Sequence, residues 1–158
     1  MKNWIICSLM GIAGALSAQT SATYTAGVIG TEYDANPGST ALVSSCTDTL
    51  LVNIPAGDYV TGLDLSYDMT STSGGWMSEQ YSYLECVSTG QKEASLANGT
   101  GNNSGTFSYA RNGLALANGL SASGEFKFVL HGFRSWGSTG QCNSVVASIG
   151  NNSWTITL

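Results

Sequence analysis

Clusters of turn-forming residues interrupt this chain at short and fairly regular intervals. They recur roughly every eight to fifteen residues and include Asn36-Pro37-Gly38, Pro55-Ala56-Gly57-Asp58, Ser73-Gly74-Gly75 and Gly150-Asn151-Asn152. Between them lie runs rich in Val, Ile, Tyr, Phe, Thr and Trp, which favour extended backbone. Many short strands separated by turns are typical of a β-sandwich or a barrel.

Several of these runs alternate between apolar and polar residues. In residues 59–69, four apolar side chains from Leu63 to Met69 alternate with Asp64, Ser66 and Asp68. Similar runs are residues 76–87, 125–133 and 154–158, and weaker candidates are residues 23–29, 47–54, 105–110 and 144–149. One apolar and one polar face per strand predicts an all-β, antiparallel two-sheet sandwich, jelly-roll-like, with about nine strands. Residues 114–120 fit either a short helical turn or a loop that crosses the end of the sandwich.

The first eighteen residues have the pattern of a secretory signal peptide. Lys2 is followed by an apolar stretch over residues 4–16 and by the small residues Ser17 and Ala18. The stretch is too short for a stable membrane span, and we expect no transmembrane segment in the mature chain. We therefore predict a secreted or periplasmic protein of about 140 residues that forms one domain. Residues 19–40 would supply an N-terminal strand and a loose segment, and residues 41–158 the sandwich.

The mature chain is acidic. After cleavage four Lys and Arg residues remain against ten Asp and Glu residues, a formal net charge of −6. Such a surface repels phosphate backbones and anionic lipids, so we expect no nucleic-acid partner. The expected partner is a glycan or another extracellular protein.

Three cysteines follow the leader, namely Cys46, Cys86 and Cys142. In an oxidising compartment one disulfide and one remaining thiol are the default, and the spacing does not resemble a zinc site. We favour a Cys86–Cys142 bond, because each of these residues lies near the end of a predicted strand pair and beside turn-forming residues. Cys46 remains open as an alternative partner.

No combination of residues predicts catalysis. His131 is the one histidine, and no G-x-S-x-G nucleophile motif is present. On an extended strand Glu79 and Glu85 would lie about 20 Å apart, too far for a two-carboxylate glycosidase mechanism. We therefore expect no catalytic residue, and a small hydrolase is the least favoured function.

The candidate binding site combines two aromatic residues at strand ends with polar neighbours: Trp76, Glu79, Gln80, His131, Arg134 and Trp136. An indole can stack on the apolar face of a sugar ring, while the polar side chains bind its hydroxyl groups. The leading hypothesis is therefore a non-catalytic carbohydrate-binding or adhesion module. These residues would otherwise be ordinary core packing, with Glu79 and Arg134 as a buried ion pair. A second hypothesis is a structural protein that self-assembles through exposed strand edges.

Two weaker signals complete the set. A structural Ca²⁺ between loops would need several oxygen ligands, and the candidates are Glu32, Asp34, Asn36, Asp48 and Asp58. The alternative is that these acids are scattered and only keep the protein soluble. Thr49, in Asp48-Thr49-Leu50, matches a short motif that some periplasmic systems modify with O-linked glycans. No other cofactor is predicted.

Within residues 54–158, one set of residues occurs in an order that chance similarity does not explain. It comprises Trp76-Met77-Ser78-Glu79-Gln80, His131, Arg134, Trp136, Cys142 and Trp154. In this set the chain resembles a β-sandwich module of secreted surface proteins from Gram-negative bacteria that use type IX secretion. The resemblance implies a β-sandwich placed in multidomain surface proteins and implies no activity. Those proteins commonly end in a sorting domain that this sequence does not show, which favours release to the periplasm or another export route.

Overall fold

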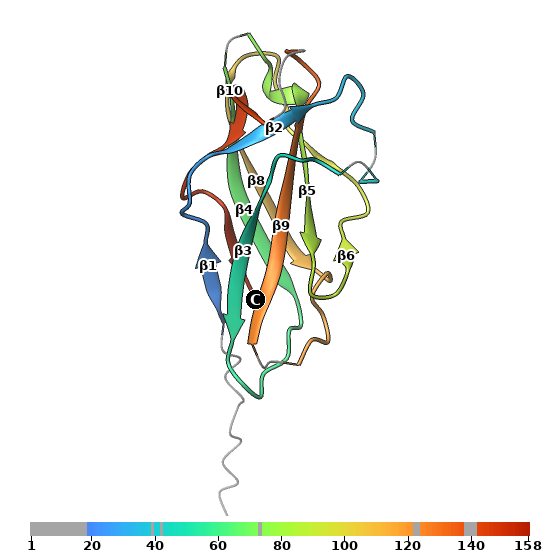
Figure 1. The fold of residues 1–158 in the computed structure, drawn as a ribbon, viewed down its shortest axis with the longest axis vertical. Helices are drawn as coiled ribbons and strands as arrows, with labels where there is room; N and C mark the ends of the chain where they lie inside the picture. The colour runs from blue at the N-terminus through green and yellow to red at the C-terminus, as the bar shows by residue number, and fades with distance from the viewer. Residues whose placement is uncertain (1–18, 39, 42, 73, 122–123, 138–141) are drawn as a thin grey trace, which may run out of the picture.

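Two layers of strands run along the molecule and face each other across one core (Figure 1). The computed structural model describes residues 19–158 except 39, 42, 73, 122–123 and 138–141, so the predicted leader, residues 1–18, lies outside the described residues. Over this range the chain forms eleven strands and one short 3-10 helix, η1 (Met77–Glu79). The predicted all-β sandwich is confirmed, with two more strands than expected. In the described part of the chain no helix has the length and hydrophobicity to cross a membrane.

The first sheet is built around β4 (Leu63–Ser71). β8 (Gly105–Leu114) pairs along one edge of β4, while β11 (Thr155–Thr157) and β10 (Asn143–Ile149) share its other edge. β1 (Ser21–Thr23) pairs with β11 at the margin of the sheet. All of these pairs are antiparallel, as the alternating pattern predicted.

The second sheet is built around β9 (Gly124–Arg134). β3 (Thr47–Ile54) pairs with one edge of β9 and β5 (Gln80–Cys86) with the other. The two-residue strands β6 (Gln91–Lys92) and β7 (Ala97–Asn98) both pair with β5. These pairs are also antiparallel.

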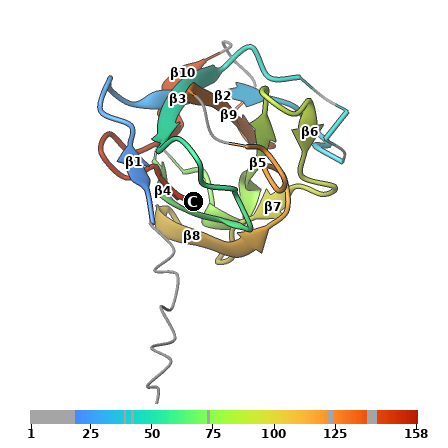
Figure 2. The ribbon, with the colours of Figure 1, turned by 90° about the horizontal axis from the view of Figure 1, so that it is seen from below.

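β2 (Ile29–Tyr33) belongs to both sheets. It pairs antiparallel with β10 and parallel with β9, where Glu32 lies opposite Phe133. Viewed along the long axis, the strands surround the core with β2 between β10 and β9 (Figure 2). The parallel pair corrects the expectation of purely antiparallel pairing, and it arises because the chain crosses from one sheet to the other through β2.

The core is formed by the apolar faces that the alternation predicted. On β4 the buried residues include Leu63, Leu65 and Met69, and on β9 they include Phe128 and Leu130. Fully burying one side chain of this size contributes roughly 1.5–3 kcal/mol to folding. This shared core presses the two sheets together.

Several predicted strands have different limits in the structure. The predicted strand 76–87 begins only at Gln80, because Trp76 and Glu79 close a turn: the Glu79 amide donates to the Trp76 carbonyl over 3.0 Å. The predicted strand 23–29 is interrupted, since β1 ends at Thr23 and β2 begins at Ile29. The strand predicted over residues 59–69 begins at Leu63 and extends to Ser71.

The predicted Cys86–Cys142 disulfide is wrong. The bond joins Cys46 to Cys142, whose Cα atoms lie 4.8 Å apart, and Cys86 is a buried free thiol. Cys86 shares the inner face of β5 with Leu84 and packs in the core. Cys142 precedes β10, the neighbour of β2, and Cys46 precedes β3. The pairing of β2 with both sheets therefore brings Cys46, and not Cys86, to Cys142.

Candidate functional site

Trp76 and Trp136 are both partly open to solvent and lie at the same end of the molecule. Their exposed fractions are 46% and 40%. Trp76 precedes η1 at the start of β5, and Trp136 follows the end of β9. These ends meet because Gln80 pairs with Arg134, and the Ser135 amide donates to the Glu79 carbonyl over 3.0 Å. The sequence placed each indole at a strand end and left open whether the two share one end; the pairing of β5 with β9 brings them to the same end.

The ring of Trp136 lies against the turn at residues 74–75. A Cβ atom at Gly74 would be 3.5 Å from the ring carbon Cη2, and one at Gly75 would be 3.5 Å from Cε3. Gly74 has a φ of +88°, a conformation that glycine adopts without strain. The turn therefore gives the indole a flat backbone support.

β10 contributes an apolar side chain beside this turn. The Thr72 amide donates to the Val146 carbonyl over 2.8 Å, and Val146 also approaches the positions of Gly75 and Gly137. Trp76, Trp136, Val146 and the turn 74–75 are together called the indole surface below.

Glu79 is the polar candidate that stays at this surface. One carboxylate oxygen, Oε2, accepts a hydrogen bond of 2.8 Å from the amide of Trp76. The side chain is half-buried, and the bond fixes the backbone that carries the first indole. Glu79 therefore acts first as a positioning residue for Trp76.

Two other candidates, Gln80 and Arg134, are enclosed beneath the surface. Their exposed fractions are 0% and 1%. The Nη1 of Arg134 donates to the carbonyl and the hydroxyl of Thr31, and burial lowers the pKa of Arg134 while Glu32 opposes that change. The Gln80 carbonyl accepts from the hydroxyl of Tyr109 over 3.2 Å. The hydrogen bonds of both residues connect neighbouring strands. Their burial argues against the prediction that they contact a ligand.

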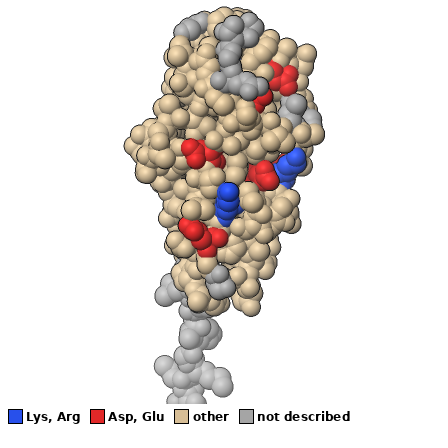
Figure 3. Space-filling model, viewed as in Figure 1, with Lys and Arg blue, Asp and Glu red and all other residues tan. Residues whose placement is uncertain are grey.

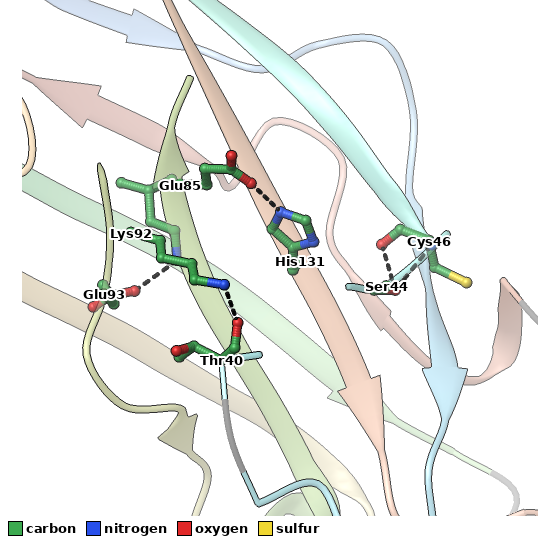
Figure 4. A network of polar contacts seen from close by, with 8 residues as sticks. Thr40, Ser44, Cys46, Glu85, Lys92, Glu93 and His131 are labelled. Carbon is green, nitrogen blue, oxygen red and sulfur yellow. Dashed lines mark hydrogen bonds and ion pairs between the residues drawn. The ribbon is translucent and has the colours of Figure 1, made fainter. Parts of the chain in front are cut away.

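His131 occupies a different place, on the outer side of the second sheet. Its Nε2 lies 3.1 Å from Oε2 of Glu85, and its ring stacks on Tyr83 with centroids 4.2 Å apart. Only 3% of the residue is exposed, because Thr40 and Ser44 lie across this part of the sheet (Figure 4). Burial lowers the pKa of His131, and Glu85 opposes the shift. This environment describes a structural histidine.

The chain that passes over His131 is attached at several points. Ser44 donates to the Gly132 carbonyl over 3.2 Å, and the Lys92 ammonium donates to the Thr40 carbonyl over 2.5 Å. Figure 4 shows the bond between Lys92 and Thr40 near the imidazole. The outer face of β5 and β9 is therefore partly covered there, which the alternation alone did not predict.

The calcium candidates do not converge. No group of three or more His, Cys, Asp or Glu side chains able to hold a metal occurs within residues 19–158, apart from the nine positions that are not described. Glu32 accepts from the Ser45 amide over 2.6 Å, and Asp34 accepts from the Asn36 amide over 2.9 Å. Asp48 accepts from the hydroxyl of Tyr24, and Asp58 lies in a turn that begins at Pro55. The carboxylates of Glu32, Asp34 and Asp48 thus have separate local partners.

Thr49, the glycosylation candidate, is half-buried on β3. Its amide donates to Oδ1 of Asp48 over 2.7 Å. On β3, Leu50 and Val52 are buried and Leu51 between them is exposed. Thr49 lies on the same side as Leu51 by this alternation, so it faces away from the core.

Charged side chains are sparse on the face formed by the second sheet (Figure 3). The basic groups seen there lie beside acidic groups, and the picture shows no broad patch of one sign. A broad electrostatic surface of the kind that binds polyanions is therefore not a feature of this face.

Sequence reasoning missed two features. The first is the contribution of Val146, which depends on strand pairing and has no local signal. The second is a pocket of about 380 Å³ at the opposite end of the sandwich, lined by Gln19, Thr61, Gly62, Asp64, Thr157 and Leu158.

Comparisons with known proteins give one structural likeness. The sequence matches no protein-family model, and no curated protein matches it. Among solved structures, a carbohydrate binding module (CBM6cm-2) from Cellvibrio mixtus lichenase 5A, in complex with cellotriose, is similar over 89% of this chain and 95% of that chain. The TM-score is 0.33 and the sequence identity 15%, and no assignment is made from it.

Proposed function

We propose that this protein is an exported, non-catalytic module that binds neutral polysaccharides through the indole surface. The observation that carries the proposal is the pair of partly exposed tryptophans at one end of the sandwich, at 46% and 40%. Tryptophan is highly buried on average, so two such residues at one surface are unusual. Their rings offer the flat apolar area on which a sugar ring stacks.

The support behind the indoles favours recognition. Trp136 lies against the turn at 74–75 and beside Val146, and the Trp76 backbone is held by Glu79. A side chain fixed before binding loses little conformational entropy when a ligand arrives. Such a surface can bind without any rearrangement of the sheets.

The charges near the surface favour an uncharged ligand. Glu79 brings a carboxylate, while the nearby guanidinium of Arg134 is only 1% exposed and donates to Thr31. An anionic polysaccharide would meet that carboxylate without an accessible cation to balance it. Neutral glycans avoid this repulsion, and their hydroxyl groups can donate to Glu79.

Export is part of the same proposal. The leader pattern over residues 1–18 supports it, and so does the Cys46–Cys142 bond, because disulfides persist in oxidising compartments. Polysaccharides of cell walls and capsules lie in the same compartment.

The proposal is tested by affinity electrophoresis and calorimetry with soluble neutral glucans, xylans and mannans. We expect Trp136→Ala to weaken binding by about tenfold or more, which corresponds to about 1.4 kcal/mol of lost stacking. Tyr59→Ala is the matched control, since Tyr59 is an aromatic residue that is 69% exposed near the other end of β4. The proposal fails if the wild type binds none of these polymers, or if Trp136→Ala binds as the wild type does.

A second candidate function, self-assembly through strand edges, is favoured by β8. This ten-residue strand pairs with β4, and its opposite edge has no backbone partner within the described part of the chain. A free edge of this length can pair with another chain. Light scattering after size-exclusion chromatography tests it, and a monomer at all concentrations rejects it.

A further inference from the structure

The described chain begins next to its last residue. The Thr20 amide donates to the Leu158 carbonyl over 3.0 Å, and the Leu158 amide donates back to the Thr20 carbonyl over 2.8 Å. Residue 20 is therefore fixed at the end of the sandwich opposite the indole surface. Gln19, one residue earlier, is exposed and has left the strand pairing.

The predicted cleavage after Ala18 would make Gln19 the first residue of the mature chain. We propose that this glutamine then cyclises to pyroglutamate. The neutral α-amine attacks the side-chain carbonyl carbon Cδ, and an N–Cδ bond forms. The Cδ–Nε2 bond breaks, and the leaving nitrogen takes the proton that the attacking amine gives up and departs as ammonia. No oxidant, reductant or other co-reactant takes part, so the step is balanced within the residue.

The chemistry of the new terminus favours this step. An α-amine has a pKa of about 7.7–8.0, so a substantial share is unprotonated and nucleophilic near neutral pH. The amine and Cδ belong to one residue and close a five-membered ring, which makes the reaction effectively unimolecular. Thr20 is held by its hydrogen bonds to Leu158, so ring closure requires only Gln19 to change its conformation. Gln19 is exposed and can do so without moving a strand.

The surroundings of Gln19 accommodate the product. Gln19 lines the pocket of about 380 Å³ together with Thr61, Gly62, Asp64, Thr157 and Leu158. The lactam has one N–H donor and one carbonyl acceptor, which suit the hydroxyl and carboxylate groups of this lining. Cyclisation also removes the positive charge of the amine, so the terminus becomes neutral beside Asp64. We expect the blocked end to resist aminopeptidases.

The inference rests on the export proposed above, and intact-mass spectrometry separates the two. The protein is purified from the extracytoplasmic fraction of its native host. We expect a chain that starts at residue 19 and is lighter by one ammonia than the unmodified sequence. A chain that starts at Gln19 with the full mass overturns the inference while export stands. A start at another residue also overturns it, and a retained leader overturns both the inference and the export.

Gln19→Asn provides the matched control. Asparagine keeps the amide but is one methylene shorter, so the same attack would require a four-membered ring. We expect this variant to be exported with the full mass of its sequence and to focus at a higher isoelectric point than the wild type. A variant that loses ammonia at residue 19 as the wild type does would contradict the mechanism. Glycan binding is measured in parallel and is expected to be unchanged, since the indole surface lies at the other end.

Discussion

The guanidinium nitrogen Nε of Arg111 and the carboxylate oxygen Oε1 of Glu93 lie 2.6 Å apart. Arg111 comes from β8 of the first sheet, and Glu93 follows β6 of the second. The other oxygen of Glu93 accepts from the Leu84 amide over 2.7 Å, and Arg111 donates to the hydroxyl of Tyr67 over 2.9 Å. Burial raises the pKa of Glu93, while Arg111 opposes that shift. The pair joins the two sheets on the side where β2 does not.

We predict that breaking this ion pair from one side is costly. Glu93→Gln or Arg111→Met should each lower the free energy of unfolding by about 3–5 kcal/mol, because the remaining charged or polar partner stays buried. The double variant should lose less than the sum of the two, with a coupling energy of about 0.5–3 kcal/mol. Urea denaturation of the four proteins measures this. Glu125→Gln, at an exposed acid, is the control, and strictly additive losses would contradict the contact.

A second prediction concerns the disulfide. Without reductant, the unfolded mature protein should show one reactive thiol, and peptide mapping should place the label on Cys86. The Cys46→Ala/Cys142→Ala double variant should lose about 2–5 kcal/mol of stability, as is usual when a native disulfide is removed. Labelling of Cys46 in place of Cys86 would show that the pairing is different.

The turn under Trp136 gives a third prediction. Gly74→Ala should cost about 1–2 kcal/mol, because alanine is strained at the φ of +88°. Gly75→Ala should have a smaller effect, since its Cβ would make an ordinary contact of 3.5 Å with the Trp136 ring. Thermal denaturation gives the cost, and tryptophan fluorescence reports whether the ring has moved. Equal costs for the two variants would argue against the turn geometry.

The fourth prediction concerns pH. Burial lowers the pKa of His131 below its usual 6.5 in the folded protein. Between the folded and unfolded pKa values the unfolded chain binds more protons, so stability is lost as the pH falls below about 6.5. His131→Phe keeps a ring against Tyr83 but cannot titrate. The wild type should therefore lose stability relative to the variant as the pH is lowered from about 8 to about 5. A constant difference over this range would contradict the buried neutral histidine.

The strands were predictable where one side of the sheet faces water. On β4 the alternation from Leu63 to Met69 coincides with burial, because side chains on a strand point to opposite faces in turn. The strand limits were less predictable, since the turn at Trp76 to Glu79 is closed by a backbone and a side-chain hydrogen bond together. The disulfide depends on the parallel pairing of β2 with β9, which has no local pattern.

The candidate site was predictable only in part. The sequence placed Trp76 and Trp136 at strand ends, but the contact of the Trp136 ring with the turn at 74–75 joins distant segments and has no local signal. Gln80 and Arg134 lie on an inward face of paired strands, and polar residues on a strand do not show by themselves which face is inward. His131 is enclosed by Thr40 and Ser44, which are far from it in the sequence. Long-range packing decided these cases.

β2 has a consequence for how this molecule can open. It is hydrogen-bonded to β10 on one edge and to β9 on the other, so separating the sheets there requires breaking backbone ladders. On the opposite side the sheets are joined by side chains such as Arg111 and Glu93. Amide hydrogen exchange should therefore be slowest along β2 and β9 and fastest along the outer edge of β8, so that transient unfolding is directional.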